Sequence, residues 1–184
     1  QIPDPLGLLS FRVQGMNSRR EPRILAEALV ALSFLHSQKS AELALDLRDR
    51  YQEDSNLDYA FAETMRALEP YWREPLAQGE SLRIKDSALA WALTHLNTEE
   101  LAGVEPSAEL YEELLTRHGL DSATYASALA GLTEQRDTTL AMEFLAAAER
   151  ADAQDDGHVD HLLSGLFGAL GSLSEQERAS LTET

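Results

Sequence analysis

The segment PRILAEALVALSFLHSQKSAELALDLRDRY, residues 22–51, contains two amphipathic patterns on either side of one short polar turn. Over residues 22–36 the apolar side chains recur every three or four positions, which places them on one face of an α-helix. Pro22 suits the first helical position, where its missing N–H group has no helical partner to lose. A second apolar face follows the polar residues 37–40. Two such helices joined by so short a turn are expected to pack antiparallel, so the segment predicts a helical hairpin.

The same pattern continues along the chain. Further helices are predicted from about Ser55 to Leu68, Asp86 to Leu96, Ser107 to Arg117, Asp121 to Leu132, Thr138 to Arg150 and His158 to Leu170. Helix–turn–helix units of roughly 30–45 residues are typical of an α-solenoid, because one pair cannot bury its apolar face alone. We therefore predict an all-α fold, a HEAT-like α-solenoid of about four antiparallel helix pairs over residues 19–184. An irregular segment, or the end of a preceding module, is expected at residues 1–18, and a plain helical bundle is the alternative architecture.

Local signals predict where helices begin and end. Ser55 with Asp58, and Asn97 with Glu100, have the spacing of N-terminal capping boxes. A proline, Pro70, is expected to end the helix that starts near Ser55. The predicted core residues lie on the apolar stripes of their helices: Leu29, Leu32, Phe61, Met65, Leu68, Trp91, Leu129 and Phe144.

The charge is large and unevenly distributed. The chain has a formal net charge of −17, from 15 Lys+Arg against 32 Asp+Glu. Such a chain repels phosphate backbones and anionic headgroups, which argues against nucleic acid and membrane surfaces as partners. Residues 93–184 hold 18 acidic and 4 basic residues. A cationic partner would therefore meet this half first, although a solvated acidic surface explains the same pattern.

Motifs that carry chemistry are few. The chain has no cysteine, which leaves no disulfide, cysteine-ligated zinc, iron–sulfur cluster or CxxCH haem attachment within it. The sequence has no GxSxG, HExxH, P-loop or dinucleotide fingerprint. Carboxylate pairs such as Glu112 and Glu113 are predicted to be ordinary exposed helix positions. We assign no catalytic residue and no cofactor, and a small helical enzyme would need a pocket assembled from distant residues.

An acidic segment with two histidines is the candidate metal site. Five positions of an EF-hand calcium loop are filled, by Asp152, Gln154, Asp156, Gly157 and Asp160. Position 12, which should supply a bidentate Glu, is Leu163. His158 and His161 lie three residues apart, and with Asp155 and Asp160 they could hold zinc or nickel. The alternative is an acidic loop that complements the N-terminus of the helix after it.

Tyr71, Trp72 and Arg73 form the most aromatic patch of the sequence. Trp, Tyr and Arg dominate binding hot spots, so this patch is a candidate partner-binding surface. The alternative is that Tyr71 and Trp72 pack into the core at a break between helices, because large aromatic side chains usually serve packing.

The segment NLDYAFAETMRALEPYW, residues 56–72, resembles part of large bacterial proteins known as PVC-type haem-binding (CxxCH) domain proteins. The stretches LAEALVALSF (25–34), ELYEELLTRHG (109–119) and ALAGL (128–132) are similar to the same helical region. The resemblance implies a parent that joins a sorbosone-dehydrogenase-like propeller, a HEAT-like region and a c-type cytochrome domain, exported to the periplasm or secreted. This chain lacks the CxxCH motif and any propeller repeat, so it corresponds to the helical connector only. The family places no catalytic residue there to carry over.

These features predict a non-catalytic helical-repeat module, for interaction or spacing, within a larger multidomain, redox-associated bacterial protein. Its contacts are expected to be a protein partner or neighbouring domains of the parent chain. The chain begins at Gln1 with neither an initiator Met nor a leader, so we expect a piece of a longer protein. A regulatory domain that binds calcium, zinc or nickel is the first alternative, and a small helical enzyme is the second.

Overall fold

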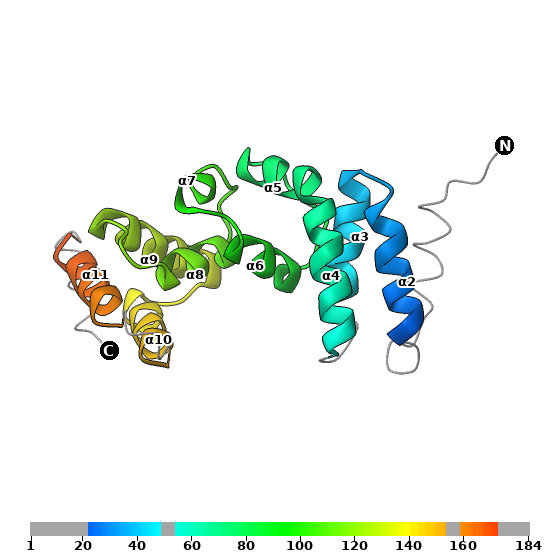
Figure 1. Cartoon of the computed structure of the whole chain (residues 1–184). Coiled ribbons are helices and arrows are strands. Elements are labelled where there is room, and N and C mark those ends of the chain that lie inside the picture. The colour runs from blue at the N-terminus through cyan, green and yellow to red at the C-terminus, as the bar shows by residue number, and fades with distance from the viewer. Residues whose placement is uncertain (1–21, 49–53, 154–158, 173–184) are drawn as a thin grey trace. The chain divides into compact units, whose positions relative to one another are not determined.

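The computed structural model describes residues 22–48, 54–153 and 159–172. Within these ranges the secondary structure consists of ten helices without a strand, so the predicted all-α fold is confirmed (Figure 1). The helices belong to two compact units, divided between Val104 and Glu105. None of the helices in the described ranges combines the length and the apolar character needed to cross a bilayer.

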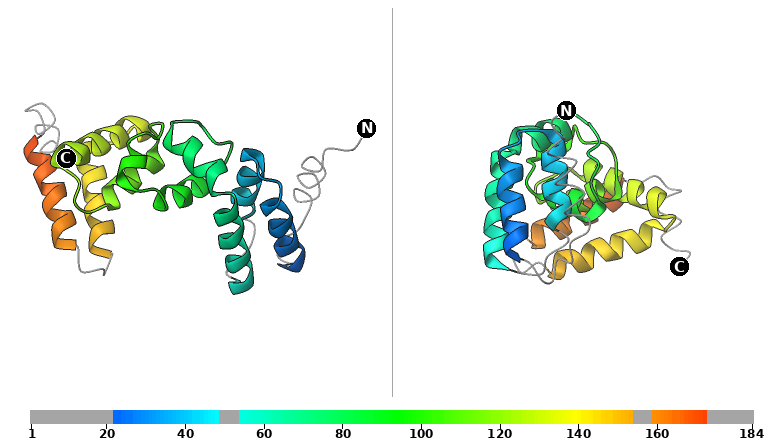
Figure 2. Two further views of the ribbon diagram at one scale, coloured as in Figure 1. Left: turned by 45° about the horizontal axis from the view of Figure 1, so that its top comes forward. Right: turned by 90° about the vertical axis from the view of Figure 1, so that its right-hand side faces the viewer.

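The first unit contains six of the described helices. They are α2 (Pro22–Ser33), α3 (Gln38–Arg48), α4 (Ser55–Ala67), α5 (Glu69–Ala77), α6 (Asp86–Thr94) and α7 (Thr98–Leu101). Helix α2 packs against both α3 and α4, and α3 also contacts α5 and α6 (Figure 2). The Thr64 hydroxyl of α4 donates a hydrogen bond of 3.1 Å to the Leu29 carbonyl of α2. Over its described residues, the pair of helices predicted from residues 22–51 is therefore confirmed as α2 and α3.

Of the two predicted N-terminal caps, one lies at the predicted residue and the other lies one residue earlier. The predicted capping box is confirmed at α7, where the Asn97 side chain accepts from the Glu100 backbone and the Glu100 side chain accepts from the Asn97 backbone. Ser55 was expected to cap α4, and that prediction is wrong by one residue. Asp54 is the cap, because its Oδ1 accepts two backbone N–H groups at 2.9 and 3.2 Å. A carboxylate satisfies the first amides of a helix as well as a hydroxyl does.

The helix that starts near Ser55 ends before Pro70, as predicted, but a new helix begins directly after that helix. Helix α4 stops at Ala67, and after Leu68 the chain starts a new helix, α5, with Pro70 in its first turn. A proline in the first turn costs no hydrogen bond, because the amides there have no partner four residues earlier. The patch of residues 71–73 therefore lies on a helix.

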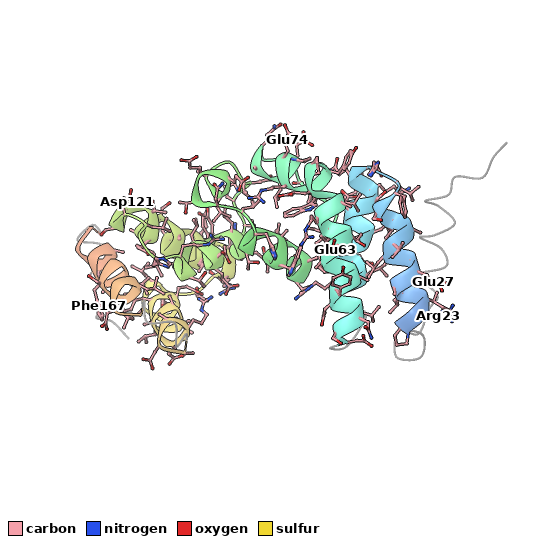
Figure 3. All side chains as sticks on the ribbon, viewed as in Figure 1. Arg23, Glu27, Glu63, Glu74, Asp121 and Phe167 are labelled. Atoms are coloured by element: carbon pink, nitrogen blue, oxygen red, sulfur yellow. The ribbon has the colours of Figure 1, made fainter. Side chains whose placement is uncertain are left out.

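The second unit contains α8 (Ala108–Thr116), α9 (Ser122–Arg136), α10 (Leu140–Ala153) and α11 (Val159–Ser172). Helix α9 contacts both α8 and α11, and α10 contacts all three other helices. The core of this unit includes Leu115, Tyr125, Leu129, Leu132, Ala147, Leu162 and Leu166. Asp121, labelled in Figure 3, caps α9, because its side chain accepts from the Thr124 backbone.

Most of the predicted core is confirmed. The buried members are Leu29, Leu32, Phe61, Met65, Leu68 and Leu129. Trp91 and Phe144 are partly buried, and Phe144 packs against the core of the second unit. Each lies at the edge of its helix's apolar stripe, where the neighbouring ring is itself exposed: His95 beside Trp91 and Phe167 beside Phe144.

Candidate functional site

The predicted patch of Tyr71, Trp72 and Arg73 is divided between the core and the surface. Trp72 is 3% exposed, and its indole Nε1 donates a hydrogen bond of 3.1 Å to the Met65 carbonyl. Tyr71 is partly exposed and stacks on the ring of His36, with 6.1 Å between the centroids. The Trp72 ring therefore packs into the core, as the alternative interpretation expected. Of the three residues in the patch, only Tyr71 and Arg73 reach the surface.

Arg73 forms ion pairs with two glutamates. Its Nη1 lies 2.7 Å from Glu69, and its Nε and Nη2 lie 2.8 and 2.9 Å from the two oxygens of Glu100. These bonds raise the pKa of Arg73 and lower the pKa of Glu100. The guanidinium thereby ties α5 to α7, which is a structural role.

A second aromatic cluster surrounds Trp91 and joins side chains from several helices. Its ring centroid lies 4.8 Å from that of Phe61, 5.9 Å from that of Trp72 and 4.1 Å from that of His95. The Arg48 guanidinium lies 5.9 Å from the Trp91 ring, within the range of a cation–π contact. Neither spacing nor motif links these residues in the sequence. Because the Trp91 ring already contacts four side chains, we assign the cluster to packing.

A polar groove of about 980 Å³ lies in the first unit, between α3 and the segment before α6. Two contacts cross this region: the Arg83 amide donates to Glu42 at 3.0 Å, and Lys85 pairs with Asp46 at 3.3 Å. The charged lining residues are Lys39, Glu42, Asp46 and Arg83. Since the two signs balance, the lining favours no charged ligand of one sign.

In the second unit Glu112 connects three helices. Its Oε1 accepts from Arg136 at 2.7 Å and from Arg150 at 2.8 Å, so α8 is bound to both α9 and α10. Arg136 also reaches Glu143 at 3.3 Å, and Glu143, only 4% exposed, accepts from the Thr138 hydroxyl at 2.7 Å. These contacts satisfy a buried carboxylate, and we assign them to stability.

The prediction that Glu112 and Glu113 are ordinary exposed positions is therefore wrong. Their side chains are 35% and 12% exposed, and Glu113 pairs with Arg117 at 2.6 Å. The arginines of the described part of the second unit, Arg117, Arg136 and Arg150, are thus all paired with glutamates.

The predicted metal site lies mostly outside the described residues. Asp155 and His158 are outside them, as is the side chain of His161, and Asp160 is an exposed residue in the first turn of α11. Within the described ranges no three His, Cys, Asp or Glu side chains are grouped as metal ligands. The site remains a prediction.

An apolar surface extends over α10 and α11, and it is the candidate functional site. Leu145 of α10 is 61% exposed. Phe167 of α11, which is labelled in Figure 3, is 59% exposed. The partly buried Phe144 joins them, because its ring meets that of Phe167 edge-on with 5.5 Å between centroids. Ala141 and Ala148 lie three or four positions from both Phe144 and Leu145, on the same side of α10. We call these five residues the α10–α11 face.

Acidic side chains border this face. Glu149 and Asp152 follow Leu145 by four and seven positions, and Asp160 precedes Phe167 by seven, so each acid lies on the side of its helix that carries the exposed apolar residue. All three acids are exposed. Residues 105–153 and 159–172 contain no lysine. Their arginines are paired with glutamates, Arg136 and Arg150 with Glu112 and Arg117 with Glu113. The α10–α11 face therefore presents apolar groups beside negative charge.

The sequence analysis did not identify this face, because a periodic pattern does not show which apolar side chains the neighbouring helices cover. The signal was present: the apolar residues between Leu140 and Ala151 are too many for a single buried face. An exposed apolar surface with a polar border can bind a partner by hydrophobic contact and orient it by charge. No protein family, curated protein or solved structure matches this chain.

Proposed function

We propose that this chain is a non-catalytic helical module that binds a protein partner or a neighbouring domain of its parent chain. The α10–α11 face carries the proposal. Exposed apolar groups that gather on neighbouring helices and are bordered by polar residues are typical of interaction sites. Leu145 is 61% exposed and Phe167 is 59% exposed, so both leave apolar area in contact with water. A partner that covered this area would gain binding free energy of roughly 25 cal/mol per Å² from the hydrophobic effect.

The architecture we propose for this module is a HEAT-like α-solenoid. In stacked helical hairpins each helix contacts its own partner and the equivalent helix of the next pair. Contacts of this kind join α2 with α4 and α3 with α5 in the first unit. They join α8 with α10 and α9 with α11 in the second unit. Each unit by itself supports the stacking of helix pairs.

The setting we propose follows from the resemblance of residues 25–34, 56–72 and 109–119 to the helical region of PVC-type haem-binding domain proteins. The parent protein would be exported to the periplasm or secreted, and redox chemistry would belong to its other domains. The module would connect or present those domains.

Site-specific photo-crosslinking in the native host tests the proposal. A photoreactive benzoylphenylalanine in place of Phe167 is expected to give a discrete adduct with another protein or with a neighbouring domain. The same amino acid in place of Tyr59, which is 70% exposed on α4, is the matched control. The proposal is wrong if position 167 gives no adduct or the same adducts as position 59. It is equally wrong if the isolated chain converts a sugar or alcohol substrate.

A further inference from the structure

We infer that the α10–α11 face binds an amphipathic helix of a protein partner, one whose apolar stripe is flanked by Lys or Arg side chains. This inference rests on the proposed function and adds the chemistry of the partner. The face offers the two components that such a helix requires: exposed apolar anchors on two neighbouring helices and an acidic border.

The apolar component fits a helix better than an extended strand. The sequence-adjacent helices α10 and α11 pack against each other, with Phe144 and Phe167 in contact between them. The described part of the chain contains no strand whose edge could pair with an extended peptide. An amphipathic helix instead lays anchors spaced at three, four and seven residues onto apolar surface between helices.

The charge component selects a basic partner. Glu149, Asp152 and Asp160 are exposed beside the apolar residues. Residues 105–184 as a whole hold 16 acidic against 4 basic residues. Complementary charge raises the rate of association and suppresses wrong partners. The corresponding face of a second copy would bring like charges together, which argues against a symmetric dimer through this surface.

The acids also predict an orientation. Asp152 lies at the end of α10 and Asp160 at the start of α11, and only residues 154–158 separate the two helices. Both acids therefore lie at the same end of the pair. We expect the basic residues of the bound helix to concentrate at the end that lies over Asp152 and Asp160.

The test uses the full chain and synthetic peptides followed by fluorescence anisotropy. The probe is a peptide of about 18 residues, long enough to be helical, with a leucine stripe flanked by lysines. A peptide with the same leucines and glutamates in place of the lysines is the matched control. We expect the lysine peptide to bind about tenfold more tightly than the glutamate peptide, and its affinity to fall as salt is added.

Variants locate the binding on the face. Leu145→Gln combined with Phe167→Ser is expected to weaken the lysine peptide about tenfold, because central apolar anchors dominate such interfaces. Tyr59→Ser removes an aromatic ring outside the face that is even more exposed than Phe167, and it is expected to leave the affinity unchanged. Neutralising the border with Glu149→Gln, Asp152→Asn and Asp160→Asn is expected to reduce the salt dependence. Since all six substituted positions are exposed, the variants should keep the wild-type circular dichroism.

Three outcomes would overturn the inference. Equal binding of the lysine peptide to the wild type and to the Leu145/Phe167 variant would place the binding elsewhere on the acidic surface. Equal binding of the lysine and glutamate peptides would show an apolar site that does not select charge. Self-association that is lost in the same variant would make a second copy the occupant. In the first two cases the inference about the partner's chemistry fails. The proposed function still holds there if photo-crosslinking from position 167 gives an adduct with another protein, so failure of the inference can be distinguished from failure of the proposed function.

Discussion

Arg73 of α5 binds Glu100 of α7 through two parallel hydrogen bonds, Nε to Oε1 at 2.8 Å and Nη2 to Oε2 at 2.9 Å. Glu100 also accepts the Asn97 backbone amide at 2.7 Å and so completes the capping box of α7. One carboxylate therefore both starts a helix and ties it to another helix. Removing this carboxylate should therefore weaken both the start of α7 and its contact with α5.

Replacing Arg73→Lys is expected to lower the free energy of unfolding by about 1 kcal/mol, because lysine cannot make the planar two-bond contact. Urea denaturation measures the change. The control is Arg23→Lys, whose guanidinium pairs with Glu27 but is 90% exposed (Figure 3). That variant should stay within about 0.5 kcal/mol of the wild type. Equal effects from both substitutions would show that the geometry of the Arg73–Glu100 pair contributes nothing.

The Arg73–Glu100 pair should also make stability depend on pH. The hydrogen bond from Arg73 holds the pKa of Glu100 below its ordinary value of 4.5 in the folded chain. The stabilisation is therefore present above 4.5, where the unfolded chain is already ionised, and is lost as pH falls through the lower folded pKa. The stability difference between the wild type and Arg73→Met should accordingly be larger near pH 7 than near pH 2. A difference that stays constant over this range would exclude the linkage.

Gly165→Ala is expected to destabilise the second unit. A Cβ at Gly165 would lie 2.5 Å from the ring of Tyr125, which is only 1% exposed and cannot move aside. Overpacking of this kind costs roughly 1–3 kcal/mol. Gly171→Ala on the same helix meets nothing within 4 Å and should be neutral or stabilise by up to about 1 kcal/mol. Thermal unfolding of the two variants under one set of conditions compares them, and a melting temperature lower for Gly171→Ala would contradict the packing of α11 on α9.

Glu112→Ala should be destabilising although Glu112 belongs to the polar side of α8. The substitution leaves the guanidinium groups of Arg136 and Arg150 without the carboxylate they share, at a cost of about 1–2 kcal/mol. Glu134→Ala removes an exposed glutamate from α9 and should change the unfolding free energy by less than about 0.5 kcal/mol. Chemical denaturation would refute this expectation if the two variants were equally stable.

Phe61→Ala and Tyr59→Ala compare two aromatic residues of one helix. Phe61 is 3% exposed and Tyr59 is 70% exposed. Truncating the buried ring should cost roughly 3–5 kcal/mol, a large part of the 5–15 kcal/mol that stabilises a typical domain. The melting temperature should fall by many degrees for Phe61→Ala and barely change for Tyr59→Ala. Similar melting temperatures would mean that the faces of α4 are assigned wrongly.

Features that depend on neighbouring residues could be predicted from the sequence. The periodicity of residues 22–48 predicted α2 and α3, and the spacing of Asn97 and Glu100 predicted the cap of α7. A helix and its cap are set by interactions over three or four positions, so a short stretch contains the whole signal. Pro70 shows the limit even at short range, because a proline suits both the end of one helix and the first turn of the next.

The candidate site was decided by tertiary structure. The periodicity of α10 marks both Leu140 and Leu145 as apolar, yet Leu140 is 6% and Leu145 61% exposed, because α8, α9 and α11 together cover only part of the helix. Glu112 and Arg150 are 38 positions apart, and no local rule pairs them. The sequence by itself determined that this chain forms amphipathic helices and which of their residues are apolar. Only packing decided which apolar residues are covered, because burial depends on the other helices that meet each face.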